Sequence, residues 1–133
     1  MQLTRQSEYA IRTLLELAAL PYGELLSSKV ISEHQDIPED FLKKTVHLLS
    51  LGGLVTTHRG PQGGVKLAKA ADQITLADIV AAIEGPIAIN PCLAPGYFCP
   101  NQVSCPVSPV LARAQQAFLA ELSKPTLADL VKN

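Results

Sequence analysis

A short segment rich in glycine and proline, Arg59-Gly60-Pro61-Gln62-Gly63-Gly64, is the feature that most constrains the fold of this chain. It separates Leu54–His58, which contains three consecutive β-branched residues, from the apolar stretch Val65–Leu67. β-Branched side chains favour extended backbone, whereas clustered glycine and proline favour turns. The pattern therefore predicts a two-stranded hairpin with a glycine-rich turn.

Three amphipathic segments precede this hairpin. We expect helices from Thr4 to Leu20, from about Ser28 to His34, and from Pro38, which suits a first helical turn, to about Ser50. The first has Thr4 at its N-cap position. The apolar stripe of the first helix consists of Ala10, Ile11, Leu14, Leu17 and Ala18. The second helix has Val30 and Ile31 on its inner face, and the third has Phe41, Leu42, Val46 and Leu49. The order helix, helix–turn–helix, hairpin predicts a mainly α winged helix with a small β-hairpin wing.

Positive charge is concentrated in the centre of the chain, although the net charge is −1. Residues 41–69 contain no acid, and their basic residues are Lys43, Lys44, Arg59, Lys66 and Lys69. This distribution on a nearly neutral chain suggests a localised anion-binding face, and a solvated charged surface is the alternative.

The third helix has the size that fits the major groove of DNA. Lys43 and Lys44 on its outer face would hydrogen-bond guanine or neutralise phosphate, and Thr45 and His47 are further candidate contacts. The hairpin would bring Arg59 to the minor groove. A plain surface hairpin with a glycine-rich turn is the alternative.

The residues Thr-Leu-Ala-Asp occur twice in the second half of the chain, starting at Thr75 and at Thr126. A threonine followed three residues later by an acid resembles a capping box, so we expect a helix to begin at each place. Gly85-Pro86 ends the first of them. Between them, a wide apolar stripe predicts a long helix that ends before Lys124-Pro125. The stripe consists of Val107, Val110, Leu111, Ala114, Ala117, Phe118, Leu119 and Leu122. Such a stripe favours dimerisation, and the expected interface is Val107, Leu111, Ala114 and Phe118.

Charged residues interrupt the N-terminal segment, and no apolar run reaches the length of a membrane span, so we expect a cytoplasmic protein. Signatures of a P-loop, a dinucleotide site or a catalytic triad are absent, so we do not expect an enzyme.

We expect one compact domain with three parts. These are a winged helix–turn–helix DNA-binding region at 1–85, a cysteine-containing cluster-binding loop at 86–106, and a dimerisation helix with a C-terminal helix at 107–133.

Cys92, Cys99 and Cys105 lie in a proline-rich loop, with six and five residues between them. Zinc sites and thioredoxin-like sites use closer pairs, and a disulfide framework would leave one cysteine over. Three thiolates in one loop can instead hold an iron–sulfur cluster, because such clusters prefer soft sulfur ligands. Three ordinary buried thiols are the alternative.

Several segments together resemble the Rrf-type (Rrf-two) family of winged-helix transcription regulators, over nearly the whole chain. They are Met1-Gln2-Leu3-Thr4, Tyr9-Ala10, Gly53-Leu54-Val55, the segment 59–64, the segment 75–80 and the three-cysteine loop. The family includes iron–sulfur cluster regulators, nitric-oxide-sensing repressors and iron regulators. The resemblance implies a homodimer whose long C-terminal helices cross, and a cluster that governs affinity for double-stranded promoter DNA.

The resemblance also bears on the fourth ligand of the cluster. Iron–sulfur cluster regulators of the family place a histidine three residues after the last cysteine, where this chain has Ser108. The nitric-oxide sensors use an acidic residue on the first helix of the other subunit, which corresponds to Glu8 here. Arg12, one helical turn later, is a candidate ion-pair partner for Glu8, and a solvated surface acid is the alternative reading of Glu8.

We therefore expect a DNA-binding transcription regulator whose cluster, 4Fe–4S in preference to 2Fe–2S, senses nitric oxide, redox state, oxygen or iron. A cluster-free thiol-based regulator of the same fold is one alternative. An iron–sulfur electron carrier is the other, but it would leave the wing and the basic helix without a role.

Overall fold

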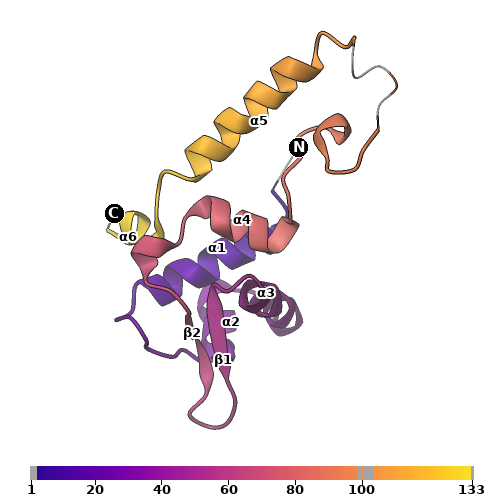
Figure 1. Cartoon of the computed structure of the whole chain (residues 1–133). Coiled ribbons are helices and arrows are strands. Elements are labelled where there is room, and N and C mark those ends of the chain that lie inside the picture. The colour runs from indigo at the N-terminus through magenta and orange to yellow at the C-terminus, as the bar shows by residue number, and fades with distance from the viewer. Residues whose placement is uncertain (1–2, 99, 101–103, 133) are drawn as a thin grey trace.

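The order of helices and strands follows the apolar periodicity of the sequence. The computed structural model describes residues 3–98, 100 and 104–132. In chain order its elements are α1 (Arg5–Ala18), α2 (Ser28–Gln35), α3 (Glu39–Leu51), β1 (Val55–His58), β2 (Gly64–Leu67), the 3-10 helix η1 (Ala71–Gln73), α4 (Leu76–Glu84), the 3-10 helix η2 (Pro91–Leu93), α5 (Ser108–Leu122) and α6 (Leu127–Val131). This arrangement confirms a mainly α winged helix with a hairpin wing and a long C-terminal helix (Figure 1).

Helix α1 lies at the centre of the body, in contact with α2, α3, α4 and α6 (Figure 1). It begins where Thr4 Oγ1 accepts a hydrogen bond from the Ser7 amide (3.2 Å), which satisfies one of the free N–H groups of the first turn. Ala10 and Leu14, on its apolar stripe, are fully buried. Because packing of such a stripe supplies most of the stability of a helix in a protein, α1 organises the core.

Helices α2 and α3 form the helix–turn–helix. Ser27 caps α2 by accepting a backbone N–H, and Asp36 ends α2 in the left-handed conformation (φ 52°). Pro38 lies immediately before α3, and not within its first turn as expected. Leu42 and Leu49 are buried, so the inner face of α3 is the predicted one.

Phe41 departs from the expectation that it faces the core. Its side chain is 51% exposed, and its ring meets the ring of Tyr9 edge-on with the centroids 6.2 Å apart. Phe41 precedes the buried Leu42 by one residue, which places it about 100° around the helix. It therefore covers the flank of α3 that faces α1.

The wing is anchored to the body by one face of the hairpin. Val55 pairs with Leu67, and these two side chains and that of Val65 are buried. Val65 also exchanges two backbone hydrogen bonds with Leu26 (2.9 and 2.8 Å), which ties β2 to the segment before α2. A Cβ on Gly63 would lie 2.1 Å from a carbonyl oxygen at the end of β1, so the turn requires glycine there. The tip projects away from the body (Figure 1).

Helices α4 and α6 both start with the predicted capping box. Thr75 and Asp78 exchange side chain-to-backbone hydrogen bonds, and Thr126 and Asp129 do the same. The Thr126 amide, by donating to the carboxylate, holds the pKa of Asp129 below its ordinary value. Leu127 is fully buried, and its amide donates to a carbonyl between η1 and α4 (2.9 Å), so α6 returns to the body.

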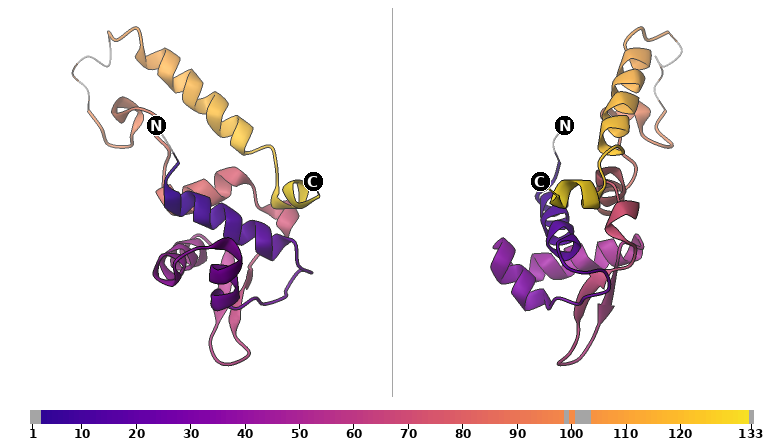
Figure 2. Two further views of the ribbon diagram at one scale, coloured as in Figure 1. Left: turned by 180° about the vertical axis from the view of Figure 1, so that it is seen from behind. Right: turned by 90° about the vertical axis from the view of Figure 1, so that its left-hand side faces the viewer.

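Helix α5 extends away from the body (Figures 1 and 2). None of its residues is buried, although its sequence is largely apolar. Gln115 Oε1 accepts a hydrogen bond from the Ile89 amide (3.0 Å), which ties α5 to the loop beside it. Among the described helices, α5 included, we find none with the length and apolar character needed to cross a membrane.

Candidate nucleic-acid interface and cysteine loop

A groove runs between α3 and the wing. It is lined by Ser28, Lys43, Val46, His47, Ser50, Thr57 and Arg59. Lys43 from α3 and Arg59, which directly follows β1, contribute positive charge, and the lining residues named include no acid. Cationic groups and hydroxyls on one surface are the groups that contact phosphate oxygens of DNA. The groove is therefore the candidate nucleic-acid interface.

The structure brings together three of the predicted DNA contacts. Lys43, His47 and Arg59 are exposed and line this one groove. Lys44 lies on the other flank of α3, with its ammonium 5.8 Å from the centroid of the Phe41 ring. Lys44 is thus outside the groove, although it is exposed on the same helix.

Thr45 was expected to be a DNA contact and is instead a core residue. It is fully buried, and its hydroxyl donates to the Phe41 carbonyl (2.8 Å). Thr45 lies three residues after the buried Leu42 and four before the buried Leu49, so it shares their face of α3. That spacing was already visible in the sequence.

Sequence reasoning missed three hydroxyl residues of the groove, Ser28, Ser50 and Thr57. Ser50 lies three residues after His47 and seven after Lys43, so helical periodicity could have found it. Ser28 begins α2 and Thr57 belongs to β1, and only the packing of these elements against α3 places them here.

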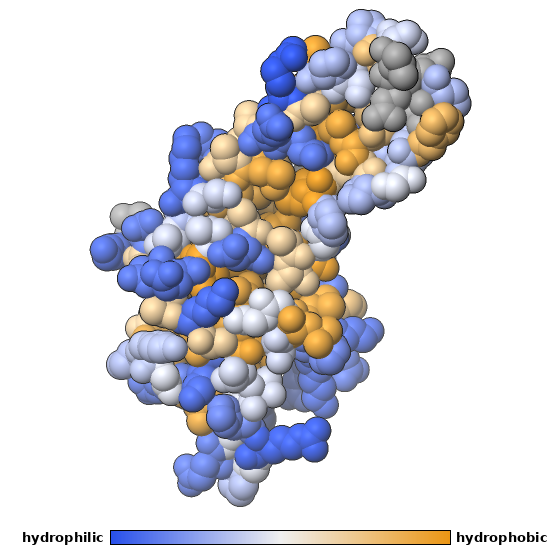
Figure 3. All heavy atoms as spheres, viewed as in Figure 1, coloured by the Kyte–Doolittle hydropathy of each residue, from blue (hydrophilic) through white to orange (hydrophobic). Residues whose placement is uncertain are grey.

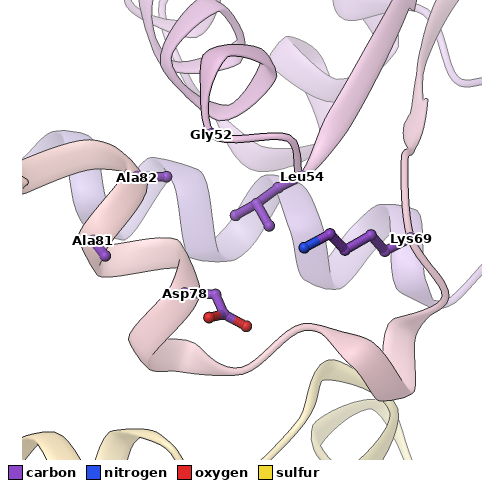
Figure 4. Close-up of a pocket in the computed structure, with 6 residues that line it drawn as sticks. All are labelled: Gly52, Leu54, Lys69, Asp78, Ala81 and Ala82. Atoms are coloured by element: carbon purple, nitrogen blue, oxygen red, sulfur yellow. The ribbon is translucent and has the colours of Figure 1, made fainter.

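A second hollow lies between α4 and the turn that follows α3 (Figure 4). Its lining is Gly52, Leu54, Lys69, Asp78, Ala81 and Ala82. Lys69 and Asp78 extend into it from opposite sides. The small residues of its lining allow the end of α3 to approach α4 closely.

Gly52→Ala is expected to destabilise the protein. The added Cβ would lie 2.8 Å from the Cβ of Ala82, and neither atom is the flexible end of a side chain. We expect a loss of about 1–3 kcal/mol in the free energy of unfolding, measured by denaturant titration. The double variant Gly52→Ala/Ala82→Gly removes the clash and should recover part of the loss. An unchanged stability of Gly52→Ala would show that α3 and α4 separate without cost.

The described cysteines lie on a loop between α4 and α5. Cys92 belongs to η2 and Cys105 precedes α5, and both are half-buried free thiols. Asn90 Nδ2 donates a hydrogen bond to Cys92 Sγ (3.2 Å). Cys99 lies outside the described residues. Within the part of the chain that the structure describes, histidine, cysteine and acidic side chains form no group of three around a common point.

Glu8 is exposed on α1 and lines a shallow hollow with Ile11 and Arg12. The expected pairing with Arg12 is not formed. Arg12 instead donates to the Gln35 carbonyl (3.0 Å) and lies over the Tyr9 ring, 5.1 Å from its centroid. The Glu8 carboxylate makes no hydrogen bond or ion pair with another described residue, so it is available to a group outside the chain.

The histidines lie on the winged helix and not on the cysteine loop. His34, at the end of α2, contacts Glu16 of α1. His47 lines the groove, and His58 ends β1. His34 thus connects α2 to α1, whereas His47 and His58 are exposed on the winged helix.

Comparisons with known proteins agree with this architecture. The model of the Rrf2 family, described as iron-dependent transcriptional regulators, matches residues 3–133. The chain is similar to CymR (YrzC), the global cysteine regulator of B. subtilis, with 28% identity and a TM-score of 0.78 over 99% of this chain and 97% of that one. It is also similar to S. aureus CymR, with 25% identity and a TM-score of 0.74 over 98% of each chain. T. potens IscR has 26% identity and a TM-score of 0.74 over 99% of this chain and 87% of that one. The chain therefore belongs to the Rrf2 family of transcriptional regulators.

Proposed function

We propose that this regulator binds promoter DNA as a homodimer, and that an iron–sulfur cluster held by Cys92, Cys99 and Cys105 controls its DNA affinity. Regulators of this family bind DNA and act as dimers. The observation that carries the proposal is the pair of free thiols, Cys92 and Cys105, on a loop that joins the winged helix to α5.

The donor set of the loop fits such a cluster. Thiolates are the ligands that iron–sulfur clusters prefer, and the Asn90 side chain already donates to the Cys92 sulfur, an interaction that tunes cluster potentials. Residues 86–105 contain no histidine, aspartate or glutamate, so a fourth protein ligand has to come from outside the loop. The Glu8 carboxylate has no partner in the part of the chain that the structure describes, which supports Glu8 of the partner subunit in that role. Three thiolates favour 4Fe–4S, and 2Fe–2S is the other form.

The proposed control acts through the elements that hold the loop. When bound, the cluster would supply an iron whose ligands can be lost to nitric oxide, oxygen or iron scarcity. A cluster bound by the three cysteines would order the loop beside α5, and the loop follows α4 directly in the chain. Helix α4 packs on α1, and α1 packs on α2 and α3. A change in the loop would therefore alter the angle between the DNA-reading helices of the two subunits. The protein would have two arrangements of these helices, and the cluster would favour one of them.

The exposed surface of α5 supports dimerisation through this helix. Apolar side chains gather along α5 and the neighbouring loop (Figure 3). Val107, just before α5, and Val110 are 54% and 52% exposed, and Ala114 is exposed beside them. Leu111 and Phe118 are half-buried. Because a single copy leaves this face open, we assign it to a second copy, with Val107, Leu111, Ala114 and Phe118 as the proposed contacts.

Arg59→Ala is expected to weaken DNA binding, because it removes a cation from the rim of the groove between α3 and the wing. If Arg59 contacts phosphate, the slope of log K against log salt should decrease by about one. Fluorescence anisotropy with a promoter fragment over a salt series measures both effects. Lys132→Ala, which removes an exposed cation of the C-terminus, is the matched control. Equal affinity of Arg59→Ala and the wild type at every salt concentration would refute the assignment.

The test of the proposed function is purification under anaerobic conditions. We expect a coloured protein with visible absorption, iron and acid-labile sulfide, and a DNA affinity that changes when the cluster is removed. A gel shift with promoter DNA tests the electron-carrier alternative, since an electron carrier would not bind a specific DNA sequence.

A cluster-free thiol-based regulator is the second candidate, because the similar structures include a global cysteine regulator. It predicts an anaerobically purified protein without colour or iron. DNA affinity would then respond to oxidation of Cys92 or Cys105, and the spectrum separates the two candidates.

A further inference from the structure

The last residue of α4, Glu84, forms a cluster of hydrogen bonds with the start of α1. Its Oε2 accepts from the Ser7 hydroxyl (2.6 Å), from the Thr4 amide (3.2 Å) and from the Thr4 hydroxyl (3.4 Å). The bond from Ser7 has the length typical of a hydroxyl that donates to a charged carboxylate. These contacts join segments that are 77 to 80 residues apart in the sequence.

The Glu84 carboxylate lies at the N-terminal turn of α1. The first turn of a helix has N–H groups without partners and the positive end of the helix dipole, and both favour a negative charge. Ser7, the main donor, is fully buried, so its hydroxyl needs an acceptor within the protein. Glu84, although itself exposed, supplies this acceptor and so supports the first turn of α1, which Thr4 caps.

Glu84 also lies next to both parts of the proposed sensing site, the cysteine loop and the turn of α1 that carries Glu8. Gly85, the next residue, ends α4 with a φ of 72° and leads into the cysteine loop. Glu8 follows Ser7 on α1, and its amide donates to the Thr4 carbonyl (3.1 Å). The same carboxylate thus holds the origin of the loop and the helical turn that carries Glu8.

We propose that Glu84 is the positioning residue that couples the cysteine loop to α1. This inference rests on the proposed cluster-controlled function. A change in the loop moves the end of α4, and Glu84 transfers the movement to the first turn of α1 and hence to Glu8 and to α3. In the dimer, Glu84 of one subunit would orient the Glu8 that reaches the partner subunit's loop, so the two sensing loops would be connected.

The test compares Glu84→Gln and Ser7→Ala with the wild type. We measure DNA affinity with and without the cluster, and take the ratio of the two affinities. Glu84→Gln removes the charge with little change in size, and Ser7→Ala removes the shortest hydrogen bond. Both should bring the ratio close to one while the thiol ligands and the cluster colour remain. Glu24→Gln removes an exposed acid outside this cluster and should leave the ratio unchanged.

A merely structural role for Glu84 gives a different result. Both affinities would then decrease by the same factor, and an unchanged ratio would overturn the proposal. A second measurement is independent of the cluster. In the cluster-free protein, Glu84→Gln should accelerate hydrogen exchange of the Glu8 amide by about tenfold, since it replaces a charged hydrogen bond with a neutral one.

The failure of the proposed function can be separated from the failure of this inference. If the wild type holds no cluster, alkylation of Cys92 and Cys105 with N-ethylmaleimide perturbs the loop instead. Alkylation should change the exchange rate of the Glu8 amide in the wild type and have no effect on it in Glu84→Gln. An exchange rate in the wild type that responds neither to cluster loading nor to alkylation would refute the coupling.

Discussion

Cys92→Ala, Cys99→Ala and Cys105→Ala are each expected to abolish cluster binding. Two thiolates hold a cubane poorly, and residues 86–105 offer no histidine or carboxylate as a replacement. Each variant, purified anaerobically, should lack visible absorption, iron and sulfide. Its DNA affinity should equal that of the cluster-free wild type, because the variants leave the groove between α3 and the wing intact.

Ser108→Ala is the matched control for the cysteine variants. Ser108 occupies the position three residues after the last cysteine and begins α5. Ser108→Ala should retain the full cluster content, because the hydroxyl is not a proposed ligand. A cysteine variant that keeps stoichiometric iron and sulfide would remove that cysteine from the ligand set.

Glu8→Ala should behave differently from the cysteine variants. A carboxylate binds iron through hard oxygen, and water or an external thiol can replace it. We therefore expect a coloured protein whose cluster has altered stability or an altered response to nitric oxide and oxygen. Spectroscopy of the iron ligands in Glu8 variants decides this assignment. A nitrogen ligand at the fourth iron would exclude Glu8 and leave the cysteine assignment unchanged.

Ala114→Glu is expected to dissociate the dimer. Ala114 is exposed in the single chain, and glutamate is a good helix former, so the subunit should fold normally. In a two-fold interface, the substitution would bury two carboxylates without partners. An uncompensated buried charge costs about 3–5 kcal/mol, which corresponds to a dissociation constant raised at least about a hundredfold. Sedimentation velocity over a concentration series measures the shift from dimer to monomer.

Gln116→Glu provides the same charge at an exposed position on another face of α5. It should sediment as the wild-type dimer and keep its DNA affinity. If Ala114→Glu also remains a dimer while far-ultraviolet circular dichroism shows a folded chain, the two-fold axis does not pass along this face. The monomeric variant should also bind a two-half-site promoter more weakly, since each subunit would then have to bind alone.

Local signals in the sequence determined most of the secondary structure. The capping boxes at Thr75 and Thr126 and the cap at Thr4 act within one helical turn, so they can be recognised without knowledge of the fold. The turn at residues 59–64 likewise predicted the wing and the pairing of its strands. The cysteine spacing and the absence of other ligands in the loop are also sequence properties, and they suffice to propose the chemistry of the site.

The tertiary structure decided which neighbour each helical face meets. Periodicity placed Arg12 one turn after Glu8, but packing of α2 on α1 gave Arg12 the Gln35 carbonyl as its partner. The Glu8 carboxylate has no partner among the described residues. The burial of Phe41 was also decided by packing. Its ring contacts Tyr9 of α1, and the side chain otherwise stays exposed. The contacts between Glu84 and Ser7 connect residues distant in the chain. Helical periodicity relates residues within one turn of each other, whereas the burial and partners of a side chain depend on which distant element covers it, and only the folded chain determines that.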